Sequence, residues 1–204
     1  MAKFWEYKLK AETLCLGERV KKDTFRPSVR TIPSTQISGA LRHVLGREVW
    51  AIGYFDEDYL KAPKVRHMVH APRDVATGVS KIPLIVEMLE DVRGRVFIEA
   101  WAEEPEAEHQ RIELVLGAFR TKGLGRCTLC YSPRPVDMDA RQGELLSRLP
   151  EEDKDKIGIE EVIKPLYGYL FKPDPDPAQY AIGGHYVRAL LEGSVVRGYA
   201  FIVR

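Results

Sequence analysis

The feature that most constrains this chain is a ten-residue segment, 117–126, which contains three glycines and three basic residues. An apolar-periodic stretch precedes it, and a β-prone stretch, 127–131, follows it. Glycine adopts positive φ without strain and lets a second backbone approach closely. Arginine and lysine at such a turn can hold phosphate oxygens, which successive backbone N–H groups also favour. The segment is therefore predicted to be a tight loop between two regular elements, either an anion-binding loop or a basic surface turn.

Length and composition indicate a globular protein. The chain has 204 residues, of which 45% are hydrophobic, enough for one large domain or one domain with a substantial appendage. No apolar run approaches the roughly 18 residues that a membrane span requires. The N-terminal residues lack the apolar segment of a signal peptide, so a cytoplasmic protein with no membrane partner is expected. Three cysteines, an odd number, argue against a secreted disulfide scaffold.

The charges are segregated along the chain although the net charge is only +1. Residues 19–47 contain seven lysines and arginines against one acid, Asp23, whereas residues 87–108 contain eight acids against two arginines. A molecule with one basic and one acidic zone can bind a polyanion on one side. Two solvated faces would give the same pattern.

Hydrophobic periodicity predicts an α+β fold for the first 132 residues. The predicted elements are a strand over 3–16, a helix over 32–46, strands over 49–55 and 65–70, a hairpin over 82–101 that turns at Arg93-Gly94, a helix over 105–119 and a strand over 126–131. This order fits a ferredoxin-like (RRM-like) β-α-β-β-α-β domain over residues 1–132.

The remaining residues, 133–204, are predicted to form a C-terminal extension packed on the first domain. Pro133 and Pro135 mark the boundary. A helix over 138–149 and a closing β-hairpin of residues 186–191 and 194–203 are expected within the extension.

The predicted helix over 32–46 has recognisable ends. Ser34 or Thr35 is a natural N-cap after Pro33, and Gly46 is a natural C-terminal stop. Apolar residues recur between these ends at the spacing of one helix face. A helix N-terminus with free N–H groups and hydroxyl side chains is an anion site.

Two segments together resemble the CRISPR-associated RAMP proteins. Residues 32–42, Ile-Pro-Ser-Thr-Gln-Ile-Ser-Gly-Ala-Leu-Arg, resemble the I-P-x-S-x-x-x-G-A-L-R helix start of that family. Residues 117–126 resemble its glycine-rich loop, often written G-G-x-R-S-R-G-x-G-R. The chain departs from the loop pattern at Ala118, where a second glycine is usual, and at Thr121, where a serine is typical. The resemblance covers about two thirds of the chain.

The resemblance implies an RRM-like fold and a place in a multisubunit antiviral ribonucleoprotein effector. The expected partners are CRISPR guide RNA, other effector subunits and, as a further option, target RNA, with no cofactor and no metal. The implied RNA-binding residues fall into a loop set, a helix set and a pair from the basic zone. They are Gly117, Arg120, Lys122, Gly123, Gly125 and Arg126 of the loop, Ser34, Thr35, Ser38 and Arg42 of the helix, and Lys21 and Lys22.

Three groups of RAMP subunit remain as alternatives. Processing endonucleases usually carry the glycine loop near the C-terminus, whereas nearly 80 residues follow it here. Filament-forming backbone subunits of type III effectors often carry an RNA-cleaving aspartate before the I-P helix, a position that Asp23 matches. Subunits that cap the guide's 5′ handle carry the loop mid-chain, and this layout favours that non-catalytic group.

Other functions remain open at this stage. An endoribonuclease would use Asp23 with a metal, or His43 as a general base toward an RNA 2′-OH. A protein-only scaffold would use the basic zone to hold an acidic partner. Cys127 and Cys130 form a lone C-x-x-C, which is predicted to be a pair of buried thiols because zinc needs four ligands.

Overall fold

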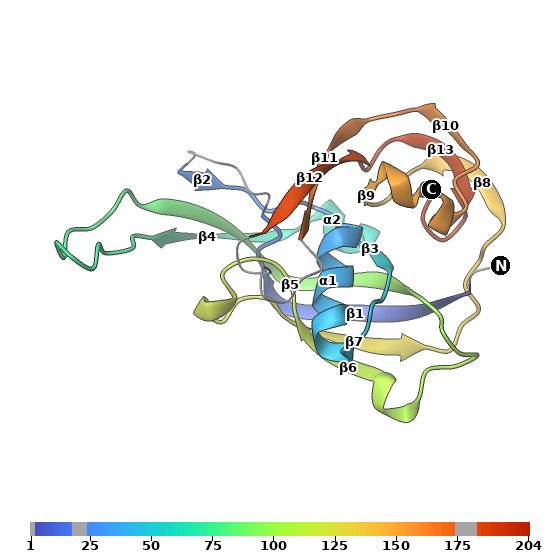
Figure 1. Ribbon diagram of the computed structural model, residues 1–204, viewed down its shortest axis with the longest axis horizontal. Coiled ribbons are helices and arrows are strands. Elements are labelled where there is room, and N and C mark those ends of the chain that lie inside the picture. The colour runs from blue at the N-terminus through green and yellow to red at the C-terminus, as the bar shows by residue number, and fades with distance from the viewer. Residues whose placement is uncertain (1–2, 18–23, 174–182) are drawn as a thin grey trace.

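The computed structural model describes residues 3–17, 24–173 and 183–204. One seven-stranded sheet and two three-stranded sheets make up most of it, with little helix (Figure 1). The predicted α+β class is confirmed. No helix in these ranges is both long enough and apolar enough to span a lipid bilayer.

The large sheet has the strand order β2-β5-β1-β7-β6, and β3 and β4 also pair with β5. All of these pairings are antiparallel except that of β2 with β5. The strands are β1 (Phe4–Leu14), β2 (Phe25–Arg26), β3 (Ala51–Phe55), β4 (Lys64–His70), β5 (Leu84–Glu99), β6 (Arg111–Val115) and β7 (Arg126–Ser132). The expected strands at 3–16, 49–55, 65–70 and 126–131 are thus confirmed.

One helix, α1 (Ser34–Leu45), covers one face of this sheet. Its buried residues Ile37 and Leu41 pack into the main hydrophobic core, together with the alternate residues of β1 that point toward the helix. Gly46 ends the helix in the left-handed conformation, as predicted. A second helix, α2 (Glu57–Lys61), makes a single turn after β3.

Four strands form two interleaved crossover units. Because β1 and β3 both run antiparallel to β5, they are parallel to each other, and α1 connects them. Similarly, β5 and β7 both run antiparallel to β1. Their crossover, however, contains the short 3-10 helix η1 (Ala107–His109) and strand β6 in place of a helix. A ferredoxin-like domain has a helix there, so that finer prediction is not confirmed.

The predicted helix over 105–119 is wrong because two periodicities overlap in this segment. Ile112, Leu114 and Leu116 are buried, whereas Val115 between them is 40% exposed. This two-residue alternation is that of a strand with one buried face. A helix over 105–119 would instead bury Val115 on the same face as Ile112 and Leu116, at the i, i+3, i+4 spacing.

The predicted hairpin over 82–101 is also wrong, since β5 runs through Arg93-Gly94 as one strand of 16 residues. Gly94 does not turn the chain. It faces β3, and a Cβ at this position would clash with the carbonyl oxygen of Tyr54. The glycine therefore permits a close approach of two strands.

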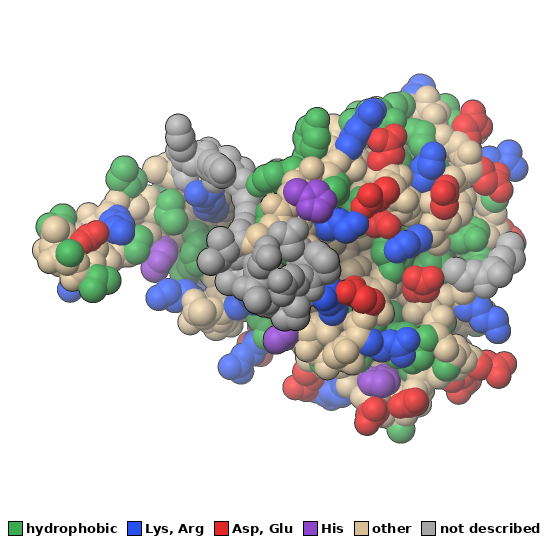
Figure 2. Space-filling view, viewed as in Figure 1, with side chains coloured by type: hydrophobic (Ala, Val, Ile, Leu, Met, Phe, Trp, Pro, Cys, Tyr) green, Lys and Arg blue, Asp and Glu red, His purple; other side chains and the backbone are tan. Residues whose placement is uncertain are grey.

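A projecting arm extends from the body of the molecule (Figure 1). It consists of β4, the first half of β5 and the connection between them, residues 71–83. Exposed apolar side chains gather on the arm (Figure 2), and they include Val69, Val75, Val79 and Ile82.

Two small sheets form the part of the chain after β7, with the orders β10-β13-β8 and β11-β12-β9. Their elements are β8 (Ala140–Glu144), β9 (Leu149–Pro150), the 3-10 helix η3 (Glu151–Ile157), β10 (Glu161–Lys164), β11 (Tyr167–Pro173), β12 (Gly184–Leu190) and β13 (Val195–Tyr199). The predicted helix over 138–149 is wrong, because β8 pairs with β13 there. The predicted closing hairpin is also wrong, because β12 and β13 belong to different sheets.

A second hydrophobic cluster joins this C-terminal part to the large sheet. Phe4, Ile52 and Phe97, on the sheet face opposite α1, pack with Phe201 and with other buried residues of the C-terminal part. The C-terminal part therefore covers one end of that face. The division of the chain into domains at residue 133 stays a prediction.

Candidate nucleic-acid interface

The glycine loop lies between β6 and β7 and is fastened to the end of β1. Gly125 closes the base of the loop, because the Leu116 N–H donates to its carbonyl at 2.8 Å. The Gly125 N–H donates to the carbonyl of Thr13 at 3.0 Å, and the Ala118 N–H donates to that of Cys15 at 2.8 Å. Backbone hydrogen bonds thus hold the loop in place on the body of the protein.

Two of the three glycines are required by this close packing. Gly117 and Gly125 both have φ of 89°, and a Cβ on either would clash with a backbone carbonyl, that of Cys15 or that of Leu116. Gly123 has φ of 85° but faces open space. Of the three loop glycines, only Gly117 and Gly125 combine a left-handed backbone with the close approach of another chain segment.

The tip of the loop is a single 3-10 turn, η2 (Arg120–Lys122). Phe119 precedes it with φ of 57°. Phe119 and Ala118 pack against a small buried cluster that contains Cys15 and Leu124. The methyl group of Ala118, which replaces a glycine of the family pattern, therefore contributes to the anchoring of the loop.

The three basic side chains of the loop are available to a ligand. Arg120, Lys122 and Arg126 are exposed, and none forms an ion pair with any residue that the structure describes. Most other arginines of the described ranges do have a carboxylate partner. Within the described part of the chain, no carboxylate pairs with these cations, and the loop presents them on a backbone held by hydrogen bonds.

The start of α1 has different surroundings from those expected. Ser34 is buried, and its N–H donates to the carbonyl of Arg148 at 3.0 Å. The Thr31 hydroxyl donates to the carbonyl of Leu146, and the Ser147 hydroxyl donates to that of Ile32. The helix start is therefore covered by residues 146–148. The N-cap is Pro33, not Ser34 or Thr35, and no side chain caps the helix.

Two other predicted RNA-binding residues on α1, Ser38 and Arg42, also have partners within the chain. The Ser38 hydroxyl accepts from the Ala51 N–H at 2.9 Å and donates to the Ala51 carbonyl at 3.2 Å, which joins the helix to the start of β3. Arg42 forms an ion pair with Glu48 at 2.6 Å, and Thr35 is half-buried. Ser34, Ser38 and Arg42 therefore have structural contacts within the chain, whereas the Thr35 side chain forms no hydrogen bond with a described residue.

Four predicted residues lie on neither the loop nor the helix start. Three of them, Lys21, Lys22 and Asp23, are outside the described residues. His43 is exposed on the last turn of α1, and no described side chain forms a hydrogen bond or ion pair with it.

The C-x-x-C pair is divided between the two faces of β7. Cys127 is buried in the main core, and its burial raises the pKa of the thiol to about 12. Cys130 is half-buried, and both cysteines are free thiols. Glu106, Glu108 and His109 form a group of potential metal ligands at the surface, where His109 already lies within ion-pair distance of both carboxylates.

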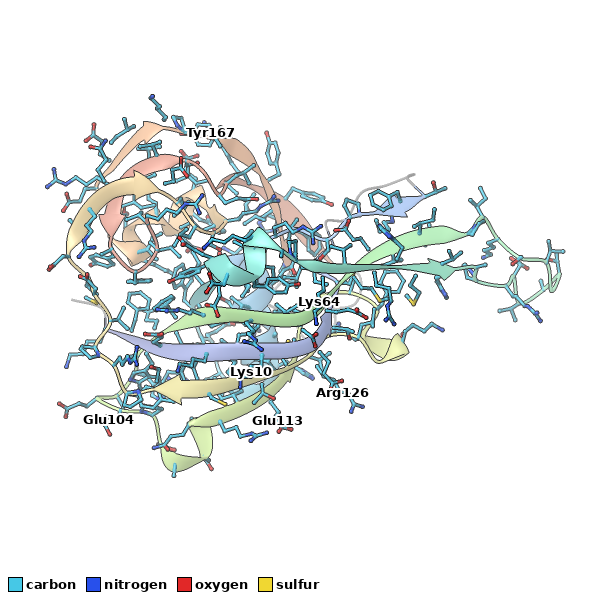
Figure 3. All side chains as sticks on the ribbon, turned by 180° about the vertical axis from the view of Figure 1, so that it is seen from behind. Lys10, Lys64, Glu104, Glu113, Arg126 and Tyr167 are labelled. Atoms are coloured by element: carbon cyan, nitrogen blue, oxygen red, sulfur yellow. The ribbon has the colours of Figure 1, made fainter. Side chains whose placement is uncertain are left out.

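A set of basic residues that no sequence motif marks lies on the sheet face opposite α1. Lys8 and Lys10 of β1 and Arg93 of β5 are exposed there, beside Arg126 at the start of β7. Figure 3 shows Lys10 and Arg126 on the side of the sheet turned away from α1. The alternation of buried and charged residues in β1 was the available signal, because Leu9 and Ala11 point into the core while their neighbours point out.

The comparisons with known proteins identify a shared fold. No family model matches the sequence, and no curated protein matches it. Two solved structures that share the fold are a chain of "Cryo-EM structure of the Type III-B Cmr-beta bound to cognate target RNA" and a chain of "Cryo-EM structure of the Type III-B Cmr-beta bound to cognate target RNA and AMPPnP, state 1". Sequence identity is 12% for each, and each alignment covers 94% of this chain and 86% of the other. The TM-scores are 0.60 and 0.61. Because the alignments cover 94% of this chain, the shared fold extends over almost its whole length.

Proposed function

We propose that this chain is an RNA-binding subunit of a CRISPR ribonucleoprotein effector of the type III class, and that its glycine loop holds the backbone of the guide RNA. The observation that carries the proposal is the group of three exposed cations, Arg120, Lys122 and Arg126, which form no ion pair with any described residue and lie on a loop held by backbone hydrogen bonds. Fold similarity to chains of an RNA-bound Cmr-beta complex supports the same assignment.

Phosphate groups are the ligand that this loop suits best. Guanidinium and ammonium groups form charge-assisted hydrogen bonds with phosphate oxygens, which are stronger than neutral ones. Such contacts position the RNA without reading its sequence. Because each contact releases counterions from the RNA, affinity falls as salt concentration rises.

Within such an effector, we favour the group of subunits that cap the 5′ handle of the guide. The glycine loop lies mid-chain and is followed by the two small sheets of the C-terminal part, a layout that matches that group. The proposal assigns no catalytic step to the chain. Purification of the native complex provides a direct test: a high ratio of absorbance at 260 to 280 nm, with bound RNAs that begin in repeat-derived sequence, is expected. RNA of unrelated origin would contradict the guide assignment.

The loop itself is tested by charge reversal of Arg120→Glu and Lys122→Glu together. Both side chains are exposed and unpaired among the described residues, so the variant is expected to keep its folding stability. Affinity for single-stranded RNA should fall about 100-fold, or about 2.7 kcal/mol, because two charged hydrogen bonds are replaced by repulsion. Fluorescence anisotropy measures the affinity, and thermal unfolding checks the fold.

The matched control reverses two exposed cations elsewhere, Arg134→Glu and Lys154→Glu, which are also unpaired among the described residues. Arg134 follows the far end of β7, and Lys154 lies on η3 in the C-terminal part. Equal losses in the two double variants would show that only net charge matters. That result would contradict a binding role for the loop.

A further inference from the structure

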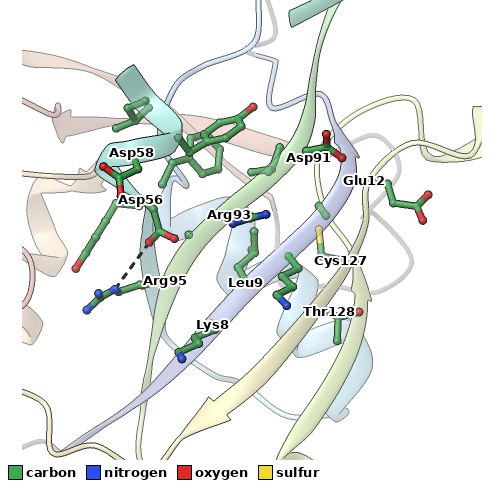
Figure 4. Close-up of a pocket in the computed structure, with 18 of the residues that line it drawn as sticks. Lys8, Leu9, Glu12, Asp56, Asp58, Asp91, Arg93, Arg95, Cys127 and Thr128 are labelled. Carbon is green, nitrogen blue, oxygen red and sulfur yellow. Dashed lines mark ion pairs between the residues drawn. The ribbon is translucent and has the colours of Figure 1, made fainter. Parts of the chain in front are cut away.

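The sheet face opposite α1 forms a broad groove of about 1650 Å³, which Figure 4 shows in close-up. Its floor consists of β5, β1 and β7, and α2 with the preceding Asp56 stands at one side. The C-terminal part covers only the end of this face that carries Phe4 and Phe97. Elsewhere on this face, no described segment covers Lys8, Lys10 or Arg93, which are exposed.

Basic residues occupy the middle of this face in direct cross-strand pairs. In the register of β1 with β5, Lys8 lies opposite Arg95 and Lys10 lies opposite Arg93. Like charges at directly opposite positions of an antiparallel pair destabilise the sheet. A polyanionic ligand or an acidic neighbour would relieve the repulsion within two adjacent pairs of this kind.

Three of the four cations form no ion pair with the acidic residues at the groove, although Lys64 and, more weakly, Arg93 lower the pKa of the Asp91 carboxyl through their charge. Asp91 forms an ion pair with Lys64, and Glu113 forms one with Arg111. Arg95 approaches Asp56 at 3.8 Å. By contrast, Lys8, Lys10 and Arg93 form no ion pair with any residue in the described ranges.

Arg126 connects this groove to the glycine loop. It is the last residue of the loop and the first of β7, and it lines the groove. Thr128, two residues further along β7, lies opposite Lys10 and adds a half-buried hydroxyl to the same face. The positive charge therefore continues from the loop onto the sheet.

We infer that this groove is a second RNA-binding surface, on which Lys8, Lys10 and Arg93 hold the sugar–phosphate backbone of single-stranded RNA that continues from the glycine loop. The inference rests on the proposed function and extends it to a surface that the loop does not include.

The residue types on this face indicate backbone contacts without base stacking. Sheet faces that stack bases present aromatic side chains on their central strands. Here the exposed positions of β1 and β5 over the groove are charged, and Tyr54 on β3 is half-buried against Phe97. Binding should therefore be independent of sequence and sensitive to salt.

The test is the double variant Lys10→Glu/Arg93→Glu in the full-length chain, measured by fluorescence anisotropy with a short fluorescein-labelled single-stranded RNA of mixed sequence. Affinity should fall about tenfold or more relative to the Arg134→Glu/Lys154→Glu control. The neutral variant Lys10→Gln/Arg93→Gln should make the slope of log affinity against log salt concentration shallower by about 1.4, from two contacts at about 0.7 each. Thermal unfolding should show the neutral variant to be at least as stable as the wild type, because repulsion between opposite cations is removed.

The other possible outcomes distinguish a failure of the groove inference from a failure of the proposed function. If the loop variant Arg120→Glu/Lys122→Glu loses affinity while the groove variant matches the control, the groove inference is overturned and the proposed function stands. If the wild-type chain binds no RNA, the proposed function fails and the groove inference fails with it. If the groove variant keeps its RNA affinity but no longer co-purifies with effector proteins, the groove is a protein interface and the inference is wrong.

A footprint locates the contact independently of mutation. Acetylation of lysines, read by peptide mass spectrometry, should be slower at Lys8 and Lys10 when the RNA is bound, and unchanged at Lys154. Equal reactivity of Lys8 and Lys10 with and without saturating RNA would contradict the inference.

Discussion

The two segments that resemble RNA-binding motifs of one protein family lie in opposite surroundings. In the glycine loop, Gly117 and Gly125 pack against backbone while the three cations are exposed. On α1, Ser34 is buried under residues 146–148, and Ser38 is hydrogen-bonded to Ala51. A sequence motif can therefore be required by packing alone. Small and hydroxyl residues suit a tight interface as well as they suit a ligand.

The largest effect expected from this comparison concerns the base of the loop. Gly125→Ala should lower the free energy of unfolding by about 3 kcal/mol, because alanine is strained at φ of 89° and its Cβ would clash with the Leu116 carbonyl. Gly123→Ala is the control, since φ is 85° but the surroundings are open, and it should cost about 1 kcal/mol. Urea unfolding measures both. Equal costs would show that the loop base is not closed as described.

A smaller effect is expected at the junction of α1 with β3. Ser38→Ala removes the acceptor of the Ala51 N–H and should lower the free energy of unfolding by about 1–2 kcal/mol. The RNA affinity of the folded variant should not change. An affinity loss at unchanged stability would place Ser38 in the RNA site and remove the contrast between the two segments.

The smallest effect, and one of opposite sign, is expected at Ser34. Its hydroxyl is buried and has no hydrogen-bond partner among the described residues, so Ser34→Ala should leave the free energy of unfolding unchanged or raise it by up to about 1 kcal/mol. Thr31→Ala, which loses the hydrogen bond to the Leu146 carbonyl, should instead cost about 1 kcal/mol. Thermal unfolding of the two variants side by side checks the sign. Destabilisation by Ser34→Ala would mean that the hydroxyl has a role in folding that its surroundings do not show.

Local patterns predicted the elements in which a single periodicity dominates. The strand alternation of β1 and the i, i+3, i+4 spacing of α1 were sufficient. They failed where one pattern has two interpretations, as at Ile112–Leu116, or where a glycine serves strand packing and not a turn, as at Gly94.

The site was predictable in part for a similar reason. Charge and glycine content marked the loop, because these features are local. The cover over Ser34 comes from residues more than 100 positions away, and the pairing of Lys10 with Arg93 depends on strand register. Neither can be read from a local pattern, since both follow from the tertiary arrangement.

RNA is expected to contact the glycine loop and not the start of α1. Photo-crosslinking of the full-length chain to RNA that contains 4-thiouridine, followed by peptide mass spectrometry, tests it most directly. Crosslinked nucleotides are expected on residues 119–126 and none on residues 34–42. Crosslinks on residues 34–42, with the loop unmodified, would contradict it.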